Sequence, residues 1–384
     1  MILIYLLLFL AAVGGNTAIW VWIINRLYGT RHRGWWVTLI RLTCQALVVL
    51  GPPAFIAVWW FATRVEAGWE ATPRALIAYV FACMALGLTV VPYVTVARWL
   101  RRTPSAQIAN HSEIVNVAAA LGHKPRGPCK HEMLAYYPFN QIFEVEFAER
   151  TFRLPRLPRA LDGLSILQVS DTHLCGCPAL AFYEWVFERC ASNPVDIVAV
   201  TGDVLDSEEH YHWIMPLFSR LRGREANWAI LGNHDSWLDV QRIRRRMERC
   251  GYMMVGGSWS EARVRDVPIV LIGNEMPWLT PTPDLTGCPD DQFRLCLSHS
   301  PDTVYWASAN KIDLVLAGHN HGGQIRFPLI GPLLVPSRYS RKYDAGTFQV
   351  GGTVLHVSRG LGGTYPLRYN CRPEVTRIVL RSQT

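Results

Sequence analysis

The sequence predicts an α/β domain that follows a membrane anchor of three helices. Three observations lead to this prediction: three long apolar runs near the N-terminus, five short strand-like runs that end in metal-binding residue types, and an uneven distribution of charge. Half of the 384 residues are hydrophobic and only 18% are charged, against about 25% in soluble domains. This composition excludes collagen-like and disordered chains, and ten Cys in 384 residues are too few for a small disulfide scaffold.

The three apolar runs cover residues 2–24, 42–62 and 75–97. Each is close to the ~20 residues that a helix needs to cross a bilayer. None contains Asp or Glu, so nothing in them indicates a pathway for ions or protons. The first run lacks the basic flank of a signal peptide and is longer than the apolar region of one. We therefore predict that residues 1–102 form an anchor of three transmembrane helices in the lipid bilayer.

The distribution of charge predicts the orientation of this anchor. Of the net charge of +8, residues 1–102 contribute +7 (nine Arg against two Glu), and the other residues contribute +1 (29 basic against 28 acidic). The loop between the second and third runs is neutral, whereas the segments after the first and third runs hold Arg26, Arg31, Arg33, Arg41, Arg98, Arg101 and Arg102. Because basic loops face the cytoplasm, we predict a multi-pass protein of the cell inner membrane with its N-terminus outside and its domain in the cytoplasm. The nearly neutral domain argues against nucleic acid as a partner.

Residues 103–158 are interpreted as a connector between the anchor and the domain. Residues 112–121 fit a short helix that ends at Gly122. The alternating apolar and acidic residues of 141–147 fit a first strand. The domain itself is expected to occupy residues 159–384.

Five strand-like runs mark the domain: residues 165–170, 196–201, 228–231, 294–298 and 313–317. They are rich in Val, Ile and Leu without alternation, as strands covered on both faces are. Each run is followed at once by metal-binding residue types, which are Asp171 and His173, Asp203, Asn233 to Asp235, His299, and His319 with His321. Because sites in α/β sheets form outside the carboxyl ends of strands, these side chains are predicted to meet at one edge.

These residue types fit a site for two divalent metal ions. Two ions about 3.5–4 Å apart can clamp the attacking and leaving oxygens of a phosphoryl transfer. Such a pair needs several His nitrogens and a carboxylate that bridges both ions. Taken singly, each motif also fits a turn, a cap or a core histidine. All five in this order predict the metal site.

Residues 164–384 resemble the calcineurin-like metallophosphoesterases. The resemblance is carried by five blocks in the order of that family: Asp-x-His, Gly-Asp, Gly-Asn-His-Asp, a lone His and Gly-His-x-His. Residues 318–326, 358–363 and 366–368 resemble the bacterial membrane-anchored branch of that family. This branch includes phosphodiesterases and UDP-2,3-diacylglucosamine pyrophosphatases. The resemblance implies a four-layer αββα sandwich, two divalent metal ions (Mn, Fe or Zn), and an enzyme that hydrolyses phosphoric esters or pyrophosphates.

The resemblance also implies a role for each site residue. It implies that Asp171, His173 and His321 bind one ion and that Asn233, His299 and His319 bind the other. Asp203 would bridge both ions. His234 is expected to stabilise or protonate the leaving oxygen, Asp235 to orient His234, and Asp206 to lie behind the ligands. The sequence departs from many relatives at Cys175 and Cys177, which are interpreted as free thiols in a reducing compartment.

An anchored enzyme of this kind suits a lipid-linked or nucleotide-linked phosphate, with UDP-2,3-diacylglucosamine as the first candidate. The alternatives are a general phosphodiesterase or phospholipid phosphatase, and a non-catalytic metal-binding membrane scaffold, against which the intact His234 argues. Residues 241–249 fit either a solvated helix face or a contact for anionic lipid. Arg338, Arg341 and Lys342 either bind the substrate phosphate or form an ordinary basic loop. No protein partner is evident from the sequence.

Overall fold

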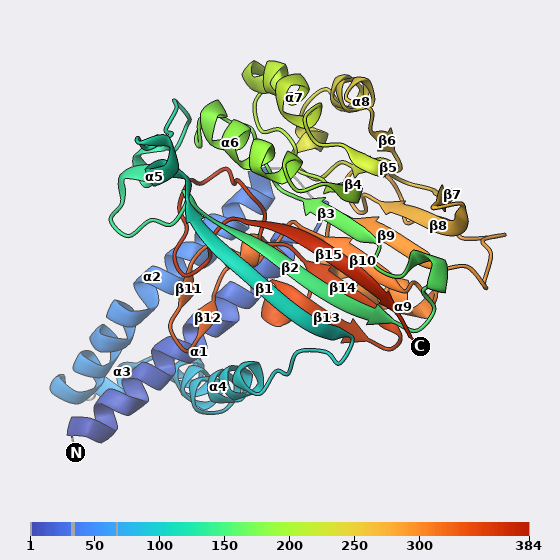
Figure 1. Ribbon diagram of the computed structural model, residues 1–384. Helices are drawn as coiled ribbons and strands as arrows, with labels where there is room; N and C mark the ends of the chain where they lie inside the picture. Colours follow the sequence, from blue (N-terminus) through green and yellow to red (C-terminus); the bar gives the residue numbers. More distant parts are fainter. Residues whose placement is uncertain (1, 32–34, 67, 384) are drawn as a thin grey trace. The chain divides into compact units, whose positions relative to one another are not determined.

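The computed structural model describes residues 2–31, 35–66 and 68–383 and divides into two compact units (Figure 1). Unit 1 combines Met1–Arg102 with Pro328–Ser340, and unit 2 combines Thr103–Phe327 with Arg341–Thr384. The predicted anchor is therefore joined by a segment from far along the chain. Arg33, which entered the prediction of orientation, lies outside the described residues.

Among its described residues, unit 1 contains three helices that are long and apolar enough to cross a membrane, as predicted. They are α1 (Ile2–Tyr28), α2 (Trp35–Arg64) and α4 (Arg74–Trp99), and the short α3 (Gly68–Ala71) precedes α4. Helices α1 and α4 approach closely at two glycines. A Cβ on Gly15 would lie 1.9 Å from the carbonyl oxygen of Cys83, and one on Gly87 would lie 1.9 Å from that of Ala11. Small residues at such crossings let membrane helices pack backbone to backbone.

Two buried asparagines of α1 also have partners within unit 1. The side-chain oxygen of Asn16 accepts hydrogen bonds from Trp20 (3.1 Å) and Tyr79 (2.5 Å). Asn25 is fully buried and bonds to segment 328–340. Its amide donates to the carbonyl oxygen of Leu333 and to the Ser340 hydroxyl, and its oxygen accepts from the backbone N–H of Val335, all at 2.9 Å. Segment 328–340 thus satisfies polar atoms that would be costly to bury unpaired.

Unit 2 is built on two sheets. The order of the seven-stranded sheet is β1-β2-β15-β3-β4-β5-β6, and its strands are β1 (Gln107–Asn116), β2 (Glu144–Leu154), β15 (Glu374–Ser382), β3 (Ser165–Val169), β4 (Val195–Thr201), β5 (Gly223–Ile230) and β6 (Met253–Met254). The order of the six-stranded sheet is β13-β14-β10-β9-β8-β7, and its strands are β13 (Gly346–Val350), β14 (Thr353–Val357), β10 (Leu314–Ala317), β9 (Arg294–Ser298), β8 (Val267–Asn274) and β7 (Trp259–Val264). The short strands β11 (Arg326–Phe327) and β12 (Gly331–Pro332) lie outside these sheets.

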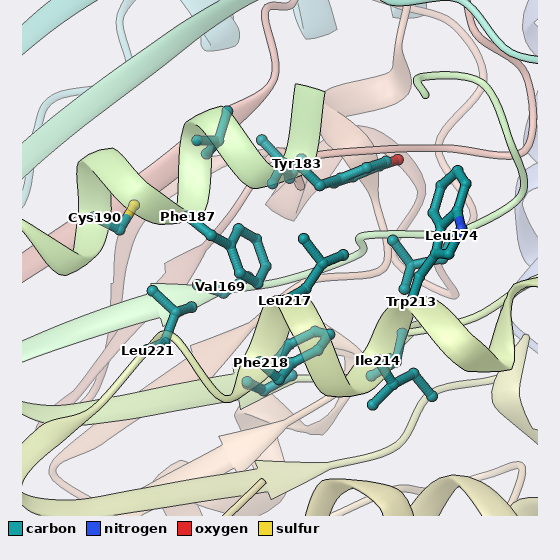
Figure 2. Packing of buried hydrophobic residues seen from close by; sticks show 14 of the residues in the cluster. Val169, Leu174, Tyr183, Phe187, Cys190, Trp213, Ile214, Leu217, Phe218 and Leu221 are labelled. Carbon is teal, nitrogen blue, oxygen red and sulfur yellow. The ribbon is translucent and has the colours of Figure 1, made fainter. Parts of the chain in front are cut away.

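The two sheets pack face to face, and helices cover their outer faces. Ile166 of β3 and Ile197 of β4 belong to one apolar cluster with Leu295 of β9. The alternate residues of β3 and β4 belong to a second cluster, with side chains of α6 (Leu180–Ala191), α7 (Tyr211–Phe218) and α8 (Val240–Arg249). Figure 2 shows the side chains of α6 and α7 meeting there. Helix α9 (Val304–Ala309) contacts β13 and β14, so the layers run helix, sheet, sheet, helix, as expected.

All five predicted strand-like runs are strands, and they form β3, β4, β5, β9 and β10. Strands β3, β4 and β5 are parallel neighbours in one sheet, and β9 and β10 are parallel neighbours in the other. The metal-binding residue types therefore come from the carboxyl ends of strands in two facing sheets. That is how ligands far apart in sequence converge on one edge of the sandwich.

The predicted connector is part of unit 2. Strand β2 pairs with β15 in parallel and with β1 antiparallel, so residues 103–158 supply two strands of the larger sheet. The helix expected over residues 112–121 is confined to α5 (Val117–Leu121), because the residues before it pair with β2. The side chain of Asn116 caps α5, and Gly122 ends it in a left-handed conformation.

Candidate metal centre

The loops that carry the predicted ligands have an unusual backbone. Five non-glycine residues among them have positive φ angles: Asp171 (52°), His173 (42°), Asp203 (52°), His319 (70°) and His321 (48°). Side chains rarely adopt this region, and each instance costs about 1–3 kcal/mol. Such strain gathers where side chains must be aimed at a ligand. Its concentration at these five positions supports a functional site.

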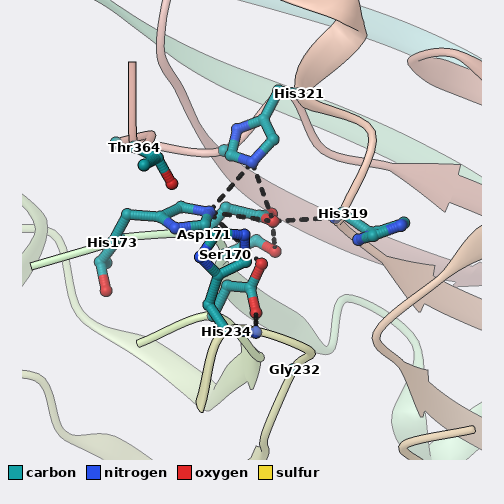
Figure 3. A network of polar contacts seen from close by, with 12 residues as sticks. Ser170, Asp171, His173, Gly232, His234, His319, His321 and Thr364 are labelled. Carbon is teal, nitrogen blue, oxygen red and sulfur yellow. Dashed lines mark hydrogen bonds and ion pairs between the residues drawn. The ribbon is translucent and has the colours of Figure 1, made fainter. Parts of the chain in front are cut away.

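Four residues form the first group of candidate ligands, and each offers an atom within 4.8 Å of the others: Asp171, His173, Asp203 and His321. The Nε2 atoms of His173 and His321 are 3.0 Å apart. The Nε2 of His321 lies 3.6 Å from Oδ1 of Asp171. Figure 3 shows the two imidazoles and this carboxylate pointing toward one another. The convergence of nitrogen and carboxylate atoms suits a divalent cation.

The second group comprises Asp203, His299 and His319, again within 4.8 Å of one another. The Oδ1 of Asn233 lies 2.9 Å from Nε2 of His299. The Nδ1 of His299 lies 2.9 Å from the carbonyl oxygen of Thr201. A carbonyl only accepts, so Nδ1 carries the proton and Nε2 keeps its lone pair for a metal.

Asp203 belongs to both groups, as the bridging role requires. Its Oδ2 lies 3.4 Å from Nε2 of His173 in the first group and 3.4 Å from Nε2 of His299 in the second. Its Oδ1 accepts a hydrogen bond from the backbone N–H of His234 at 2.8 Å. The structure thus brings all seven predicted ligands together, and this donor set of His, Asp and Asn fits two divalent ions.

Three glycines leave room for these side chains. A Cβ on Gly232 would lie 2.2 Å from Oδ1 of Asp203, and one on Gly318 would lie 2.3 Å from Oδ2 of Asp171. A Cβ on Gly202 would lie 2.6 Å from Nδ1 of His299. Any other residue at these positions would displace a candidate ligand.

The carboxylate beside His234 is Asp206, whereas the sequence led us to expect Asp235 there. The Oδ1 of Asp206 lies 2.8 Å from Nδ1 of His234 and 2.7 Å from Nδ1 of His173. Asp235 accepts instead from the backbone N–H groups of Gly232, Val204 and Leu205 at 2.8–3.0 Å. Asp235 therefore ties the loop after β5 to the loop after β4 and holds His234 through the backbone.

Asp206 stays ionised between its two histidines. Burial by itself would raise the pKa of Asp206, but His173 and His234 outweigh burial and hold this pKa below its usual value. The hydroxyl of Thr364 donates to its other oxygen at 2.7 Å. The Nδ1 atoms of His173 and His234 both face this carboxylate, so their Nε2 atoms are directed toward the site. The spacing of Asp206 after Asp203 was a weak signal in the sequence, because it lies outside the five blocks.

Arg368 is a further buried residue of the centre that the sequence did not assign. It is fully buried, and its Nη2 lies 3.2 Å from Nδ1 of His321. Its guanidinium also donates to the carbonyl oxygens of His321, Arg359 and Gly362. Gly362 in turn donates to the carbonyl oxygen of Asp171 at 2.7 Å. Arg368 thus braces the loops that carry two candidate ligands, which gives segments 358–363 and 366–368 a structural role.

The tentative substrate residues fall in different units. Arg338 belongs to unit 1, and Arg341 and Lys342 belong to unit 2. The ammonium of Lys342 donates to the hydroxyl of Tyr305 at 2.6 Å and lies 5.3 Å from the ring of Tyr343. Their role in substrate binding stays a prediction.

The other features singled out in the sequence also lie in unit 2. The basic segment is α8, which buries Ile243 and Met247 and pairs Arg244 with Glu275 at 2.5 Å. Cys175 and Cys177 are free thiols, as predicted.

The fold and the site define an α/β sandwich whose clustered Asp, His and Asn side chains could hold two divalent metal ions. The family model for calcineurin-like phosphoesterases matches residues 164–323. An uncharacterized metallophosphoesterase of Bacillus subtilis, YkuE, is 30% identical over 247 residues, which cover 62% of this chain and 86% of that protein. The chain belongs to the calcineurin-like metallophosphoesterases, and it is a metal-dependent phosphoester hydrolase.

Two further relatives carry named activities. The phosphodiesterase YaeI of Escherichia coli is 27% identical over 220 residues, which cover 56% of this chain and 81% of that protein. The UDP-2,3-diacylglucosamine pyrophosphatase LpxG of Chlamydia trachomatis is 26% identical over 292 residues, which cover 58% of this chain and 85% of that protein. The resemblance that the sequence motifs suggested is therefore confirmed at the level of the family.

Proposed function

We propose that this protein hydrolyses a phosphodiester or pyrophosphate bond of a lipid-linked substrate at the cytoplasmic face of the inner membrane. The observation that carries the proposal is the position of Asp203, equally distant from a histidine of each ligand group. That geometry is what a pair of ions acting on one phosphoryl group requires. The three apolar helices of unit 1 are long and apolar enough to confine the enzyme to a membrane, and the basic flanks of these helices favour a cytoplasmic domain.

The chain supplies ligands, orientation and a proton in this mechanism. When bound, the two ions polarise the phosphoryl oxygens and lower the pKa of water. Asp203 would be a ligand to both ions, because it belongs to both groups of candidate ligands. His234 lies at the edge of the centre, with 17% of its side chain exposed, where it can reach the leaving oxygen. Asp206 fixes its Nδ1, so its Nε2 is the atom that stabilises or protonates that oxygen.

UDP-2,3-diacylglucosamine is the first specific substrate that we propose. A relative named as a pyrophosphatase of this compound aligns with more than half of this chain. A diacylated substrate also suits a membrane-confined site. The second candidate is a general phosphodiesterase or phospholipid phosphatase, which the similarity to YaeI favours. A scaffold without activity is disfavoured, because His234 and Asp206 are paired at 2.8 Å beside the ligands.

Product analysis tests this proposal on the purified full-length protein. The protein is loaded in turn with Mn²⁺, Fe²⁺ or Zn²⁺ and incubated with UDP-2,3-diacylglucosamine, a glycerophospholipid or a chromogenic phosphodiester, and the products are identified by mass. Cleavage of the nucleotide-linked lipid to UMP and a lipid phosphate supports the first candidate. Cleavage of the chromogenic diester or phospholipid alone supports the second, and the absence of turnover with every metal and substrate would refute both. The Asp203→Ala protein serves as the background control.

A further inference from the structure

Unit 2 exposes a group of large apolar side chains that the mechanism does not use. Met133, Tyr136, Tyr137 and Phe139 lie in the segment that connects β1 to β2, and the ring of Tyr365 contacts His131 of the same segment. The exposed fractions of Met133, Tyr136, Tyr137, Phe139 and Tyr365 are 73%, 57%, 56%, 88% and 50%, respectively. We call these five residues the 133–139/365 patch. Large apolar side chains that cluster on an exposed surface mark a site that contacts a protein, a membrane or a ligand.

The backbone beneath the patch is held in place. Asn140 donates through its amide to the carbonyl oxygen of Leu134 at 3.0 Å and to that of Pro366 at 2.8 Å. The hydroxyl of Tyr369 donates to the carbonyl oxygen of Pro138. Phe139 has a φ angle of 59°, which is rare for an aromatic residue. A fixed backbone that turns aromatic side chains outward favours a binding surface over a loosely folded loop.

The patch is connected to the catalytic edge of the metal centre. The ring of His131 lies 4.6 Å from the ring of Tyr365. The next residue toward the N-terminus, Thr364, donates to Asp206 at 2.7 Å, and Asp206 lies 2.8 Å from His234. Thr364 is the residue drawn beside His173 and His321 in Figure 3. A ligand resting on Tyr365 is therefore one residue from a side chain that contacts Asp206.

Positive charge accompanies the apolar side chains. Lys124, Arg126 and Lys130 precede the patch, against the single acidic residue Glu132. The guanidinium carbon of Arg126 lies 4.0 Å from the centre of the Tyr136 ring. Aromatic and aliphatic side chains mixed with cations are typical of surfaces that lie at the boundary between lipid head groups and acyl chains.

We propose that the 133–139/365 patch contacts the membrane surface and binds the acyl chains of a lipid-linked substrate, so that its phosphate enters beside His234. The occupant is lipid, because the same chain carries three helices suited to span a bilayer and because the patch combines tyrosines with cations. The second half of this inference rests on the proposed function. The first half, contact with lipid, does not.

Photo-crosslinking tests the contact without any substrate. Benzoylphenylalanine replaces Met133 or Phe139 in the full-length protein, which is reconstituted into vesicles of phosphatidylethanolamine and phosphatidylglycerol. The matched control is Met253, a methionine of strand β6 that is also exposed, at 45%. We expect phospholipid adducts at positions 133 and 139, about tenfold more abundant than at position 253, since large apolar side chains favour lipid over water by at least that factor. Crosslinks to a second copy of the protein, or no lipid adduct, would overturn the inference.

A kinetic comparison tests the link to the substrate. The variant with both Met133→Ser and Phe139→Ser is expected to raise the KM for the lipid-linked substrate about tenfold through lost apolar contact, whereas Met253→Ser leaves that KM unchanged. Equal KM values in both variants would overturn the acyl-chain role. Lipid adducts without turnover of any lipid substrate would refute the proposed function and leave the membrane contact standing. Turnover of the lipid substrate without lipid adducts would refute the contact alone.

Discussion

Unit 2 buries two groups of acidic and histidine side chains, and they differ in how their charges are balanced. The first is the metal centre. The second, which we call the 150/356/374 network, lies on β2, β14 and β15. In it, Glu374 pairs with Arg150 at 3.2 Å and with Arg359 at 2.5 Å. His356 contacts Arg150 through Nε2 and lies 2.6 Å from Oε1 of Gln168 through Nδ1.

The charges of the network are balanced by other side chains of the protein, whereas those of the metal centre are not. In the network each charged group faces an opposite charge or a hydrogen-bond partner, and Arg150, His356 and Glu374 lie on strands. In the metal centre the lone pairs of carboxylates and imidazoles converge within 4.8 Å, and five residues have strained backbones. This difference shows that the network serves folding, while the centre is arranged for added cations.

The largest effect is expected from Asp203→Ala, which removes the ligand shared by both groups. Activity on any phosphoester should fall by more than about 1000-fold, equivalent to ~4 kcal/mol of transition-state stabilisation. The metal content of the purified protein, measured by elemental analysis, should fall as well. Asp235→Asn is the comparison, since Asp235 contacts only backbone N–H groups. Turnover at the wild-type rate by Asp203→Ala would contradict the bridging role.

The second effect separates the residue that acts on the substrate from the one that orients it. His234→Ala should lower kcat by about 10²–10⁴-fold, the usual contribution of a general acid, with the metal content unchanged. Asp206→Asn should lower kcat by about 10–100-fold, as loss of an orienting partner does, and should change the pH–rate profile of the enzyme, because the Asp206 carboxylate carries the negative charge beside the site. An unchanged pH–rate profile in Asp206→Asn, together with a shifted one in Asp235→Asn, would instead support Asp235 as the residue that orients His234, as the sequence led us to expect.

The third effect concerns folding. Glu374→Gln leaves Arg150 buried without its counter-charge, whereas Arg359 keeps Glu146 as a partner at 2.8 Å. Removal of one partner of a buried ion pair costs about 3–5 kcal/mol. The free energy of unfolding of the full-length protein in detergent should fall by that amount, while the bound metal per folded molecule is unchanged. A loss of metal without a loss of stability would show that the network belongs to the metal centre.

The smallest effect is a pH dependence of stability. Burial, followed by the charge of Arg150, lowers the pKa of His356 to about 3, from about 6.5 in an unfolded chain. Between these values the unfolded state binds a proton that the folded state does not, so stability falls as pH decreases below about 6.5, by at most about 1.4 kcal/mol per pH unit. His356→Gln keeps the hydrogen-bonding capacity without this proton. Unfolding curves at several pH values should show a shallower loss for the variant, and equal slopes would exclude His356 as a cause.

Most of the fold and the candidate ligands could be predicted because they are encoded locally. A run such as residues 196–201 is a buried strand by composition alone, and Asp203 follows it within two residues. The three apolar helices are encoded in the same way. The connector was harder to interpret, because β1 owes its existence to pairing with β2 and its own sequence has mostly exposed side chains.

The three candidate membrane helices, the class of domain, the family and the ligand types could therefore be read from the sequence alone. Three features required the packed structure: the carboxylate that faces His234, the bracing of two ligand loops by Arg368, and the bonding of segment 328–340 to Asn25 of α1. The physical reason is the distance along the chain. Asp206 and His234 are 28 residues apart, and Asn25 and Leu333 are 308 residues apart. Short-range patterns encode strands and loops, whereas contacts of this kind exist only once the sheets have packed.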